Sequence, residues 1–130
     1  MGVALITGSA GLIGSEAARH FAGLGMHIAG IDNDMRRYFF GSDGSTQWSL
    51  RLLMSSLGSQ YTHFNVDIRD REGLGRIFTH YKTDICLVVH AAAQPSHDRT
   101  IREPVTDFDV NAAGTLNDLE HTRLHAPDAV

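Results

Sequence analysis

The sequence predicts an α/β protein in which helices cover both faces of a parallel sheet. Apolar segments of strand length alternate four times with segments of helical periodicity, a pattern typical of parallel sheets with right-handed crossovers. Val3–Ile6 and Ile85–Val89 are apolar throughout, whereas Tyr61–Val66 mixes polar and apolar residues. The first and fourth strands are therefore expected inside the sheet and the third at its outer side. This polarity favours a Rossmann-type, three-layer α/β/α fold with the strand order 3-2-1-4.

The first strand leads directly into a glycine-rich turn. Gly8, Gly11 and Gly14 follow Thr7. Apolar residues then recur at helical spacing, with Gly25 as a C-terminal stop, at Ala17, Ala18, Phe21 and Leu24. A strand-to-helix turn leaves backbone N–H groups free at the positive end of the helix dipole, where a pyrophosphate can bind. Gly8 suits the tight turn, Gly11 lets the backbone approach the phosphates, and Gly14 lets the helix pack closely on the strand.

The second strand, Ile28–Ile31, ends in an acidic residue. Asp32 lies 21 residues beyond Gly11. An acid at about this distance, at the end of the second strand, accepts hydrogen bonds from the adenosine ribose in dinucleotide-binding proteins. The two features together predict a dinucleotide site, and the alternative is a tight turn without a ligand.

The middle of the chain supplies one long connection and two more helices. Asp32–Thr46 has turn residues but no clean period, so we expect a loop that borders the nucleotide site. Trp48, Leu52 and Leu53 indicate a short helix that ends near Leu57, before Gly58. After the third strand, Asp70 is a candidate N-cap for a helix whose apolar stripe is Leu74, Ile77, Phe78 and Tyr81.

The last predicted helix runs from Pro104, a residue suited to a first helical turn, to about Leu124. Its apolar face consists of Val105, Phe108, Ala112, Leu116 and Leu119. Without a fifth strand, the apolar fourth strand would be an open edge, which proteins usually avoid. We therefore expect the chain to be the N-terminal part of something longer, with a fifth strand beginning at Asp128–Val130.

Composition narrows the class of protein. A chain of 130 residues is expected to form one domain, here residues 1–130. Its formal net charge of −4 gives no basic patch for nucleic acid. Cys86 is the single cysteine, and no apolar run approaches the ~20 residues that span a bilayer, so we expect a cytoplasmic protein without a membrane segment.

Five ordered motifs resemble the extended short-chain dehydrogenase/reductases, the NAD-dependent epimerase/dehydratase family. They are Thr7–Gly14 (TGSAGLIG), Asp32–Asn33, Asp67–Ile68, His90–Ala93 and, in the last helix, Asn111-Ala-Ala-Gly-Thr115. Within this family, the segments Asp32–Thr46 and Gln94–Asp98 resemble the CDP-paratose (CDP-tyvelose) 2-epimerase group. The resemblance implies a nucleotide-sugar epimerase of carbohydrate metabolism, with a 4-epimerase or a 4,6-dehydratase as the alternative.

The resemblance also assigns residues to NAD. Gly8, Gly11, Leu12, Ile13 and Gly14 would surround the pyrophosphate. Asp32 and Asn33 would hold the adenosine ribose, and a carboxylate there disfavours the 2′-phosphate of NADP, for which Arg36 or Arg37 could argue. Asp67 and Ile68 would flank the adenine, although Asp67 could also merely turn the chain. The remaining assignments are Ala91, Ala92 and Ala93 beneath the cofactor, Asn111 as a buried supporting residue, and Ser96 near the sugar.

One family feature is missing. The family's base is a tyrosine followed four residues later by a lysine, whereas Tyr38, Tyr61 and Tyr81 are followed at that distance by Ser42, Asn65 and Ile85. We therefore expect no turnover from this chain alone, and a non-catalytic dinucleotide-binding module is the alternative from another functional class. The resemblance further implies a possible homodimer through the helix at 104–124.

Three histidines have structural interpretations. His121 and His125 have the i, i+4 spacing of a zinc pair but no evident third ligand, so we expect no metal. His90 is interpreted as a packed, hydrogen-bonded residue at the end of its strand.

Overall fold

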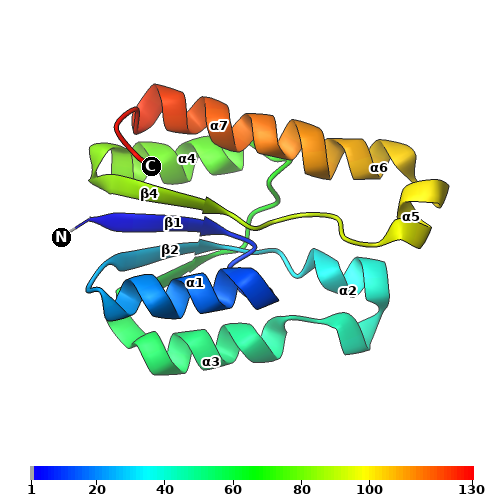
Figure 1. Cartoon of the computed structure of the whole chain (residues 1–130), viewed down its shortest axis with the longest axis horizontal. Coiled ribbons are helices and arrows are strands. Elements are labelled where there is room, and N and C mark those ends of the chain that lie inside the picture. The colour runs from blue at the N-terminus through cyan, green and yellow to red at the C-terminus, as the bar shows by residue number, and fades with distance from the viewer. Residues whose placement is uncertain (1) are drawn as a thin grey trace.

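The computed structural model, which describes residues 2–130, is an α/β/α sandwich around one parallel sheet (Figure 1). The strands are β1 (Val3–Thr7), β2 (His27–Ile31), β3 (Tyr61–Phe64) and β4 (Ile85–His90), in the order β3-β2-β1-β4. All pairings are parallel. The predicted fold class and strand order are therefore confirmed.

Helices cover the two faces of the sheet in pairs. The long helices are α1 (Leu12–Gly23), α3 (Gln47–Leu57), α4 (Arg71–Tyr81) and α7 (Gly114–His125). In Figure 1, α1 and α3 lie below the sheet, and α4 and α7 lie above it. Alternate residues of the strands point to the two faces, so Ala4 and Ile6 pack with the first pair and Val3 and Leu5 with the second.

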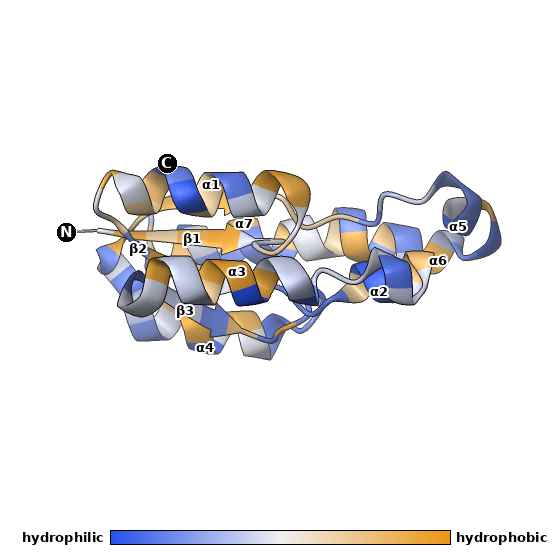
Figure 2. Cartoon of the chain, turned by 90° about the horizontal axis from the view of Figure 1, so that it is seen from below, coloured by the Kyte–Doolittle hydropathy of each residue, from blue (hydrophilic) through white to orange (hydrophobic). Residues whose placement is uncertain are grey.

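Shorter elements extend beyond the carboxyl ends of the strands. They are α2 (Met35–Phe40), α5 (His97–Arg102), α6 (Pro104–Phe108), the 3₁₀ turn η1 (Ser42–Gly44) and the π turn η4 (Asp109–Ala113). Two further 3₁₀ turns, Gly58–Gln60 and Lys82–Asp84, lead into the amino ends of β3 and β4. Figure 1 shows α2 on one side and α5 with α6 on the other side of the strand ends. Figure 2 shows the same elements projecting from the sandwich, with α5 mainly hydrophilic.

Two element predictions need correction. The segment after Asp32 is not a plain loop, because it contains α2 and η1, and Phe39 of α2 is buried. The third strand ends at Phe64 rather than Val66. Neither α2 nor α5 has enough residues for a visible helical period, which is why the pattern did not reveal them.

The predicted apolar face of the last helical segment does not face the core. The segment is continuous through α6, η4 and α7, but Val105, Phe108, Leu116 and Leu119 are all more than 60% exposed. The opposite side is buried, at Val110, Gly114, Asp118 and His121. Apart from Val110, small and polar residues therefore make the contact with α4 and the sheet, and the large apolar residues are exposed.

The outer edge of β4 is not fully open. Val130 donates its N–H to the Cys86 carbonyl at 3.2 Å and accepts from the Val88 N–H at 2.8 Å. A residue that bonds in this way to both neighbours of Leu87 is placed as in a parallel ladder. The end of the described chain thus lies where the sequence predicted a fifth strand.

Candidate functional site

The site lies at the carboxyl ends of β1, β2 and β4, where the chain turns from strand to helix. A cavity of about 260 Å³ is lined there by Gly8, Gly11, Leu12, Ile13, Gly14, Asp32, Asn33, Asp67, Ile68, Ala91, Ala92 and Ala93, together with Met35, Arg36, Thr46, Pro95 and Val110. We call it the nucleotide cleft. It brings together four segments that are far apart in the sequence, as the carboxyl edge of a parallel sheet does in ligand-binding α/β proteins.

The glycine turn has no room for side chains at two positions. Gly8 has a φ of +66°, and a Cβ there would come within 2.8 Å of the backbone of Ala91 and Ala92. A Cβ on Gly14 would collide with the Gly8 carbonyl oxygen. Gly8 therefore lets β1 turn close to the β4 loop, and Gly14 lets α1 begin directly on the turn.

The start of α1 is open to a ligand. Gly11 is the N-cap, no side chain caps the helix, and its first turn contains no acidic residue. The first N–H groups of a helix have no partner within it, and the dipole gives this end a partial positive charge. Leu12 and Ile13, which carry such N–H groups, are exposed at the cleft. This combination fits an anionic group such as a pyrophosphate.

Asp32 lies beside this helix end. Its Oδ2 accepts from the Ala10 N–H at 3.0 Å, and its Oδ1 accepts from the Asp34 N–H at 2.8 Å. Each carboxylate oxygen can accept two hydrogen bonds, so both oxygens keep a free lone pair. Asp32 is therefore held in place and still able to accept from a ligand hydroxyl.

Asp67 lines the cleft and is held by polar contacts. It accepts from Asn33 Nδ2 at 3.2 Å and forms an ion pair with Arg69 at 2.7 Å. Burial alone would raise the pKa of the Asp67 carboxyl, but hydrogen bonds from the side chain and backbone of Arg69 outweigh burial and lower the pKa below its usual value. Asp67 also turns the chain, since it accepts from the Arg69 N–H at 2.8 Å.

The floor of the glycine turn is tied to β3. Ser9 is fully buried, and its Oγ lies 2.8 Å from the hydroxyl of Tyr61. Burial raises the pKa of Tyr61 to about 12, against the hydrogen bond with Ser9, which lowers it. A Cβ on Gly30 would clash with the Tyr61 ring, so that glycine makes room for the ring beneath the turn.

The loop after β4 is anchored at several points. Ala91 and Ala92 donate their N–H groups to the Thr7 carbonyl (3.1 Å) and Thr7 Oγ1 (3.3 Å). The His90 ring lies 2.8 Å from Thr7 Oγ1 and 3.1 Å from Thr115 Oγ1, which confirms it as a packed, hydrogen-bonded histidine. The small side chains of this loop therefore form a fixed wall of the cleft.

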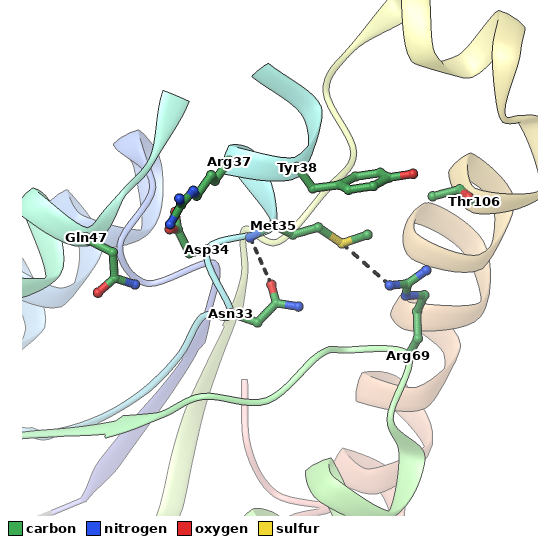
Figure 3. A pocket seen from close by; sticks show the side chains of 8 residues that line it. All are labelled: Asn33, Asp34, Met35, Arg37, Tyr38, Gln47, Arg69 and Thr106. Atoms are coloured by element: carbon green, nitrogen blue, oxygen red, sulfur yellow. Dashed lines mark hydrogen bonds between the residues drawn. The ribbon is translucent and has the colours of Figure 1, made fainter. Parts of the chain in front are cut away.

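A second, wider cavity of about 910 Å³ adjoins the cleft and shares Asn33 and Met35 with it. Figure 3 shows its lining, with Tyr38 and Met35 of α2 on one side and Arg69 and Thr106 on the other. At its rim the Tyr38 hydroxyl donates to Glu103 Oε2 at 2.7 Å. This bond raises the pKa of Tyr38 and is the main cause of the lowered pKa of Glu103.

Residues 4–130 match the model of the NAD-dependent epimerase/dehydratase family. The chain belongs to this family. It is 34% identical over 121 residues to CDP-paratose 2-epimerase of Salmonella typhi, covering 93% of this chain and 32% of that protein. It is 31% identical over 121 residues to human UDP-glucose 4-epimerase, with 93% and 34% covered.

A solved structure of the family shows the same arrangement. The Thermus thermophilus UDP-glucose 4-epimerase, crystallised in complex with NAD, superposes with a TM-score of 0.73 at 32% identity, over 95% of this chain and 34% of that one. The chain thus spans about a third of the length of these epimerases.

Two residues assigned by the family resemblance lie away from the cleft lining. Asn111 is exposed rather than buried, and it acts on the β4 loop by accepting from the Gln94 N–H (2.8 Å) and donating to the Gln94 carbonyl (3.2 Å). Ser96 is the N-cap of α5 and accepts from the Arg99 N–H. The sequence signals missed Gln94, a buried residue whose side chain bonds to Thr100 and Asp107.

The two histidines of α7 have packing roles in this family member. The His121 ring stacks on Phe78 at 5.6 Å and its Nε2 lies 2.8 Å from the Arg71 carbonyl oxygen. His125 stacks on His121 at 5.7 Å. Within residues 2–130, no group of three or more metal-ligating side chains is present, and no helix is long and apolar enough to cross a membrane.

Proposed function

We propose that this chain binds NAD in the nucleotide cleft as the cofactor portion of a nucleotide-sugar epimerase. The observation that carries the proposal is the uncapped start of α1 beside Asp32 in the lining of one cavity. The N–H groups of Leu12 and Ile13 would hold the pyrophosphate. Asp32 and Asn33 would accept and donate hydrogen bonds at the adenosine ribose.

The other walls suit the remaining parts of the dinucleotide. Asp67 and Ile68, which line the cleft, would flank the adenine. Ala91–Ala93 would pass beneath the cofactor, where larger side chains would fill the space. When bound, NAD supplies reversible hydride transfer with a sugar carbon; the residues of this chain bind and orient it.

NAD is favoured over NADP because of the charge at the ribose. The fixed Asp32 carboxylate repels a 2′-phosphate. Arg36, the cationic side chain that lines the cleft, is placed over the Phe40 ring at 4.7 Å. Arg37 lines the wider cavity instead.

We further propose that the whole protein acts as a CDP-paratose 2-epimerase. The support is the 34% identity to the Salmonella enzyme. A 4-epimerase or a 4,6-dehydratase is the alternative, because relatives with those names match at 31% and 32% identity. The Tyr-x-x-x-Lys pair and the sugar-binding residues would lie in sequence after Val130, which is already paired with β4 as a fifth strand would be.

A homodimer through α6 and α7 and a cytoplasmic location belong to the same proposal. The exposed apolar face at Val105, Phe108, Leu116 and Leu119 supports the dimer. Sedimentation of the chain and of Leu116→Asp tests it, since a charge at the centre of that face should leave only monomer. The location rests on the single cysteine.

Calorimetric titration tests the cofactor assignment. NAD should bind the parent chain more tightly than NADP, and Asp32→Ala should reduce the preference by removing the repelling charge. Glu16→Ala, an exposed acid on α1 away from the cleft lining, is the control. Equal affinity of the parent for both dinucleotides would refute the ribose assignment; a stop codon after Val130 in the gene would favour a non-catalytic binding module.

A further inference from the structure

The residue that follows Asn33 has an unusual backbone. Asp34 has φ 58° and ψ 31°, in the left-handed region, and is one of two residues other than glycine with positive φ in residues 2–130. This conformation is unfavourable for most L-residues, although aspartate and asparagine tolerate it better than others. Contacts around Asp34 must therefore hold it there.

Those contacts come from the far end of the same loop. The Asp34 carboxylate accepts from the Thr46 N–H at 2.7 Å, from Thr46 Oγ1 at 3.2 Å and from Ser45 Oγ at 2.7 Å. These three bonds close the segment 34–46, which carries α2 and η1. Thr46 itself lines the nucleotide cleft, so the closed end of the loop is part of its wall.

The backbone N–H of Asp34 contacts Asp32, a residue of the cleft lining. Its N–H donates to Asp32 Oδ1 at 2.8 Å, while the Ala10 N–H holds Oδ2 at 3.0 Å. Both oxygens of the Asp32 carboxylate thus accept a hydrogen bond from the backbone. One hydrogen bond comes from the glycine turn, and the other comes from Asp34, whose side chain is tied to Ser45 and Thr46.

We propose that Asp34 is a positioning residue for the cofactor. Its hydrogen bonds with Ser45 and Thr46 hold its own N–H against Asp32, and this N–H orients the Asp32 carboxylate toward the adenosine ribose. This inference rests on the proposed binding of NAD. Asp34 is placed in the lining of the wider cavity beside the cleft, so its role is to orient Asp32 and not to touch the ribose (Figure 3).

The test measures recognition of one hydroxyl group. ADP and 2′-deoxy-ADP differ only in the ribose 2′-OH, which an acid at the position of Asp32 accepts from. Calorimetry of the parent chain should show ADP binding at least about tenfold more tightly, as expected for a hydrogen bond to a charged group. In Asp34→Ala this ratio should fall to about threefold or less, because the N–H of residue 34 is no longer held against the Asp32 carboxylate.

Matched variants separate a loss of Asp32 positioning from a general loosening of the segment 34–46. Asp43→Asn removes the same charge from the same loop at an exposed residue outside both cavities, and should keep the parent ratio. Asp34→Asn, which tolerates the backbone conformation and keeps one acceptor oxygen, should restore most of the ratio. Asp34→Gly adopts the conformation without strain but lacks the side-chain hydrogen bonds, and replaces Asp34→Ala if that variant does not fold.

The outcomes distinguish the two levels of the proposal. If Asp32→Ala discriminates between the two nucleotides as the parent does, or the parent does not discriminate, the ribose assignment fails and the positioning role with it. If Asp32→Ala loses the discrimination but Asp34→Ala and Asp34→Gly keep it, the positioning role is overturned and the assignment of Asp32 stands.

Discussion

Because α1 packs closely on the glycine turn, adding one methyl group at Gly14 should lower the free energy of unfolding. In Gly14→Ala the new Cβ would collide with the Gly8 carbonyl oxygen and lie 2.7 Å from the Gly8 carbonyl carbon and 2.8 Å from Ser9 Cα. All three are backbone atoms of a turn that is itself anchored, so the helix must move. Overpacking of this kind costs about 1–3 kcal/mol.

A second glycine of α1 provides the control. Gly23 ends the helix, and a Cβ there would meet nothing within 4 Å. Gly23→Ala should therefore be neutral or stabilising by up to about 1 kcal/mol, because alanine is the better helix former. The same substitution in the same helix is thus expected to have opposite signs at the two positions.

Urea unfolding followed by far-ultraviolet circular dichroism measures both effects. Circular dichroism is preferable to tryptophan fluorescence, since Trp48 is 62% exposed and reports little of the core. Gly14→Ala should lower the free energy of unfolding by about 1–2 kcal/mol after the gain in helix propensity is subtracted, and it should weaken NAD binding. A Gly14→Ala chain as stable as Gly23→Ala would refute the close packing of α1 on the turn.

Three further predictions concern stability. Tyr61→Phe should cost about 1–2 kcal/mol, because the buried Ser9 hydroxyl loses its partner; an unchanged urea midpoint would contradict that contact. Burial lowers the pKa of His63, opposed by Asp32, so its contribution to stability is present above the unfolded pKa near 6.5 and is lost as the pH falls below it. The urea midpoint should drop between pH 7.5 and 5.5, and the drop should be smaller in His63→Gln; equal drops would exclude His63 as the cause. Asp70→Ala should cost about 1 kcal/mol through loss of the N-cap bond to the Gly73 N–H (2.9 Å), which Asp70→Asn should largely preserve.

The sheet could be predicted from the sequence because its signals are local. The polarity of β1 and β3 indicated an inner and an outer strand, as observed, whereas the apolar β4 is the outer strand of the described sheet with Val130 along its edge. The N-cap at Asp70 was likewise visible, and its side chain accepts the predicted bond. In both cases a residue and its immediate neighbours determine the structure.

The loop after β2 and the last helix could not be predicted in the same way. The conformation of Asp34 depends on Thr46, twelve residues away, and no local pattern indicates that bond. Apolar periodicity identified the face at Leu116 and Leu119 but did not indicate that this face is exposed. The contact with the core is made instead by Gly114 against Ile68. Asn111 was expected to be buried, but its position depends on the π turn, which has no sequence signature of its own.

The candidate site was predictable to the extent that it consists of strand ends. Gly8, Asp32, Asp67 and Ala91–Ala93 each follow a strand, and a parallel sheet brings such residues to one edge. The supporting residues Tyr61 and Gln94 were not predicted as such, because their partners come from other elements. The positions of the ligand-facing groups thus follow from the topology, and their support follows from the packing.

A crystal structure of this chain with NAD would show directly whether the nucleotide cleft holds the cofactor. We expect the pyrophosphate within hydrogen-bond distance of the Leu12 and Ile13 N–H groups, and the adenosine ribose hydroxyls within hydrogen-bond distance of Asp32. A dinucleotide bound elsewhere, or a cleft that stays empty at saturating NAD, would contradict the proposed site.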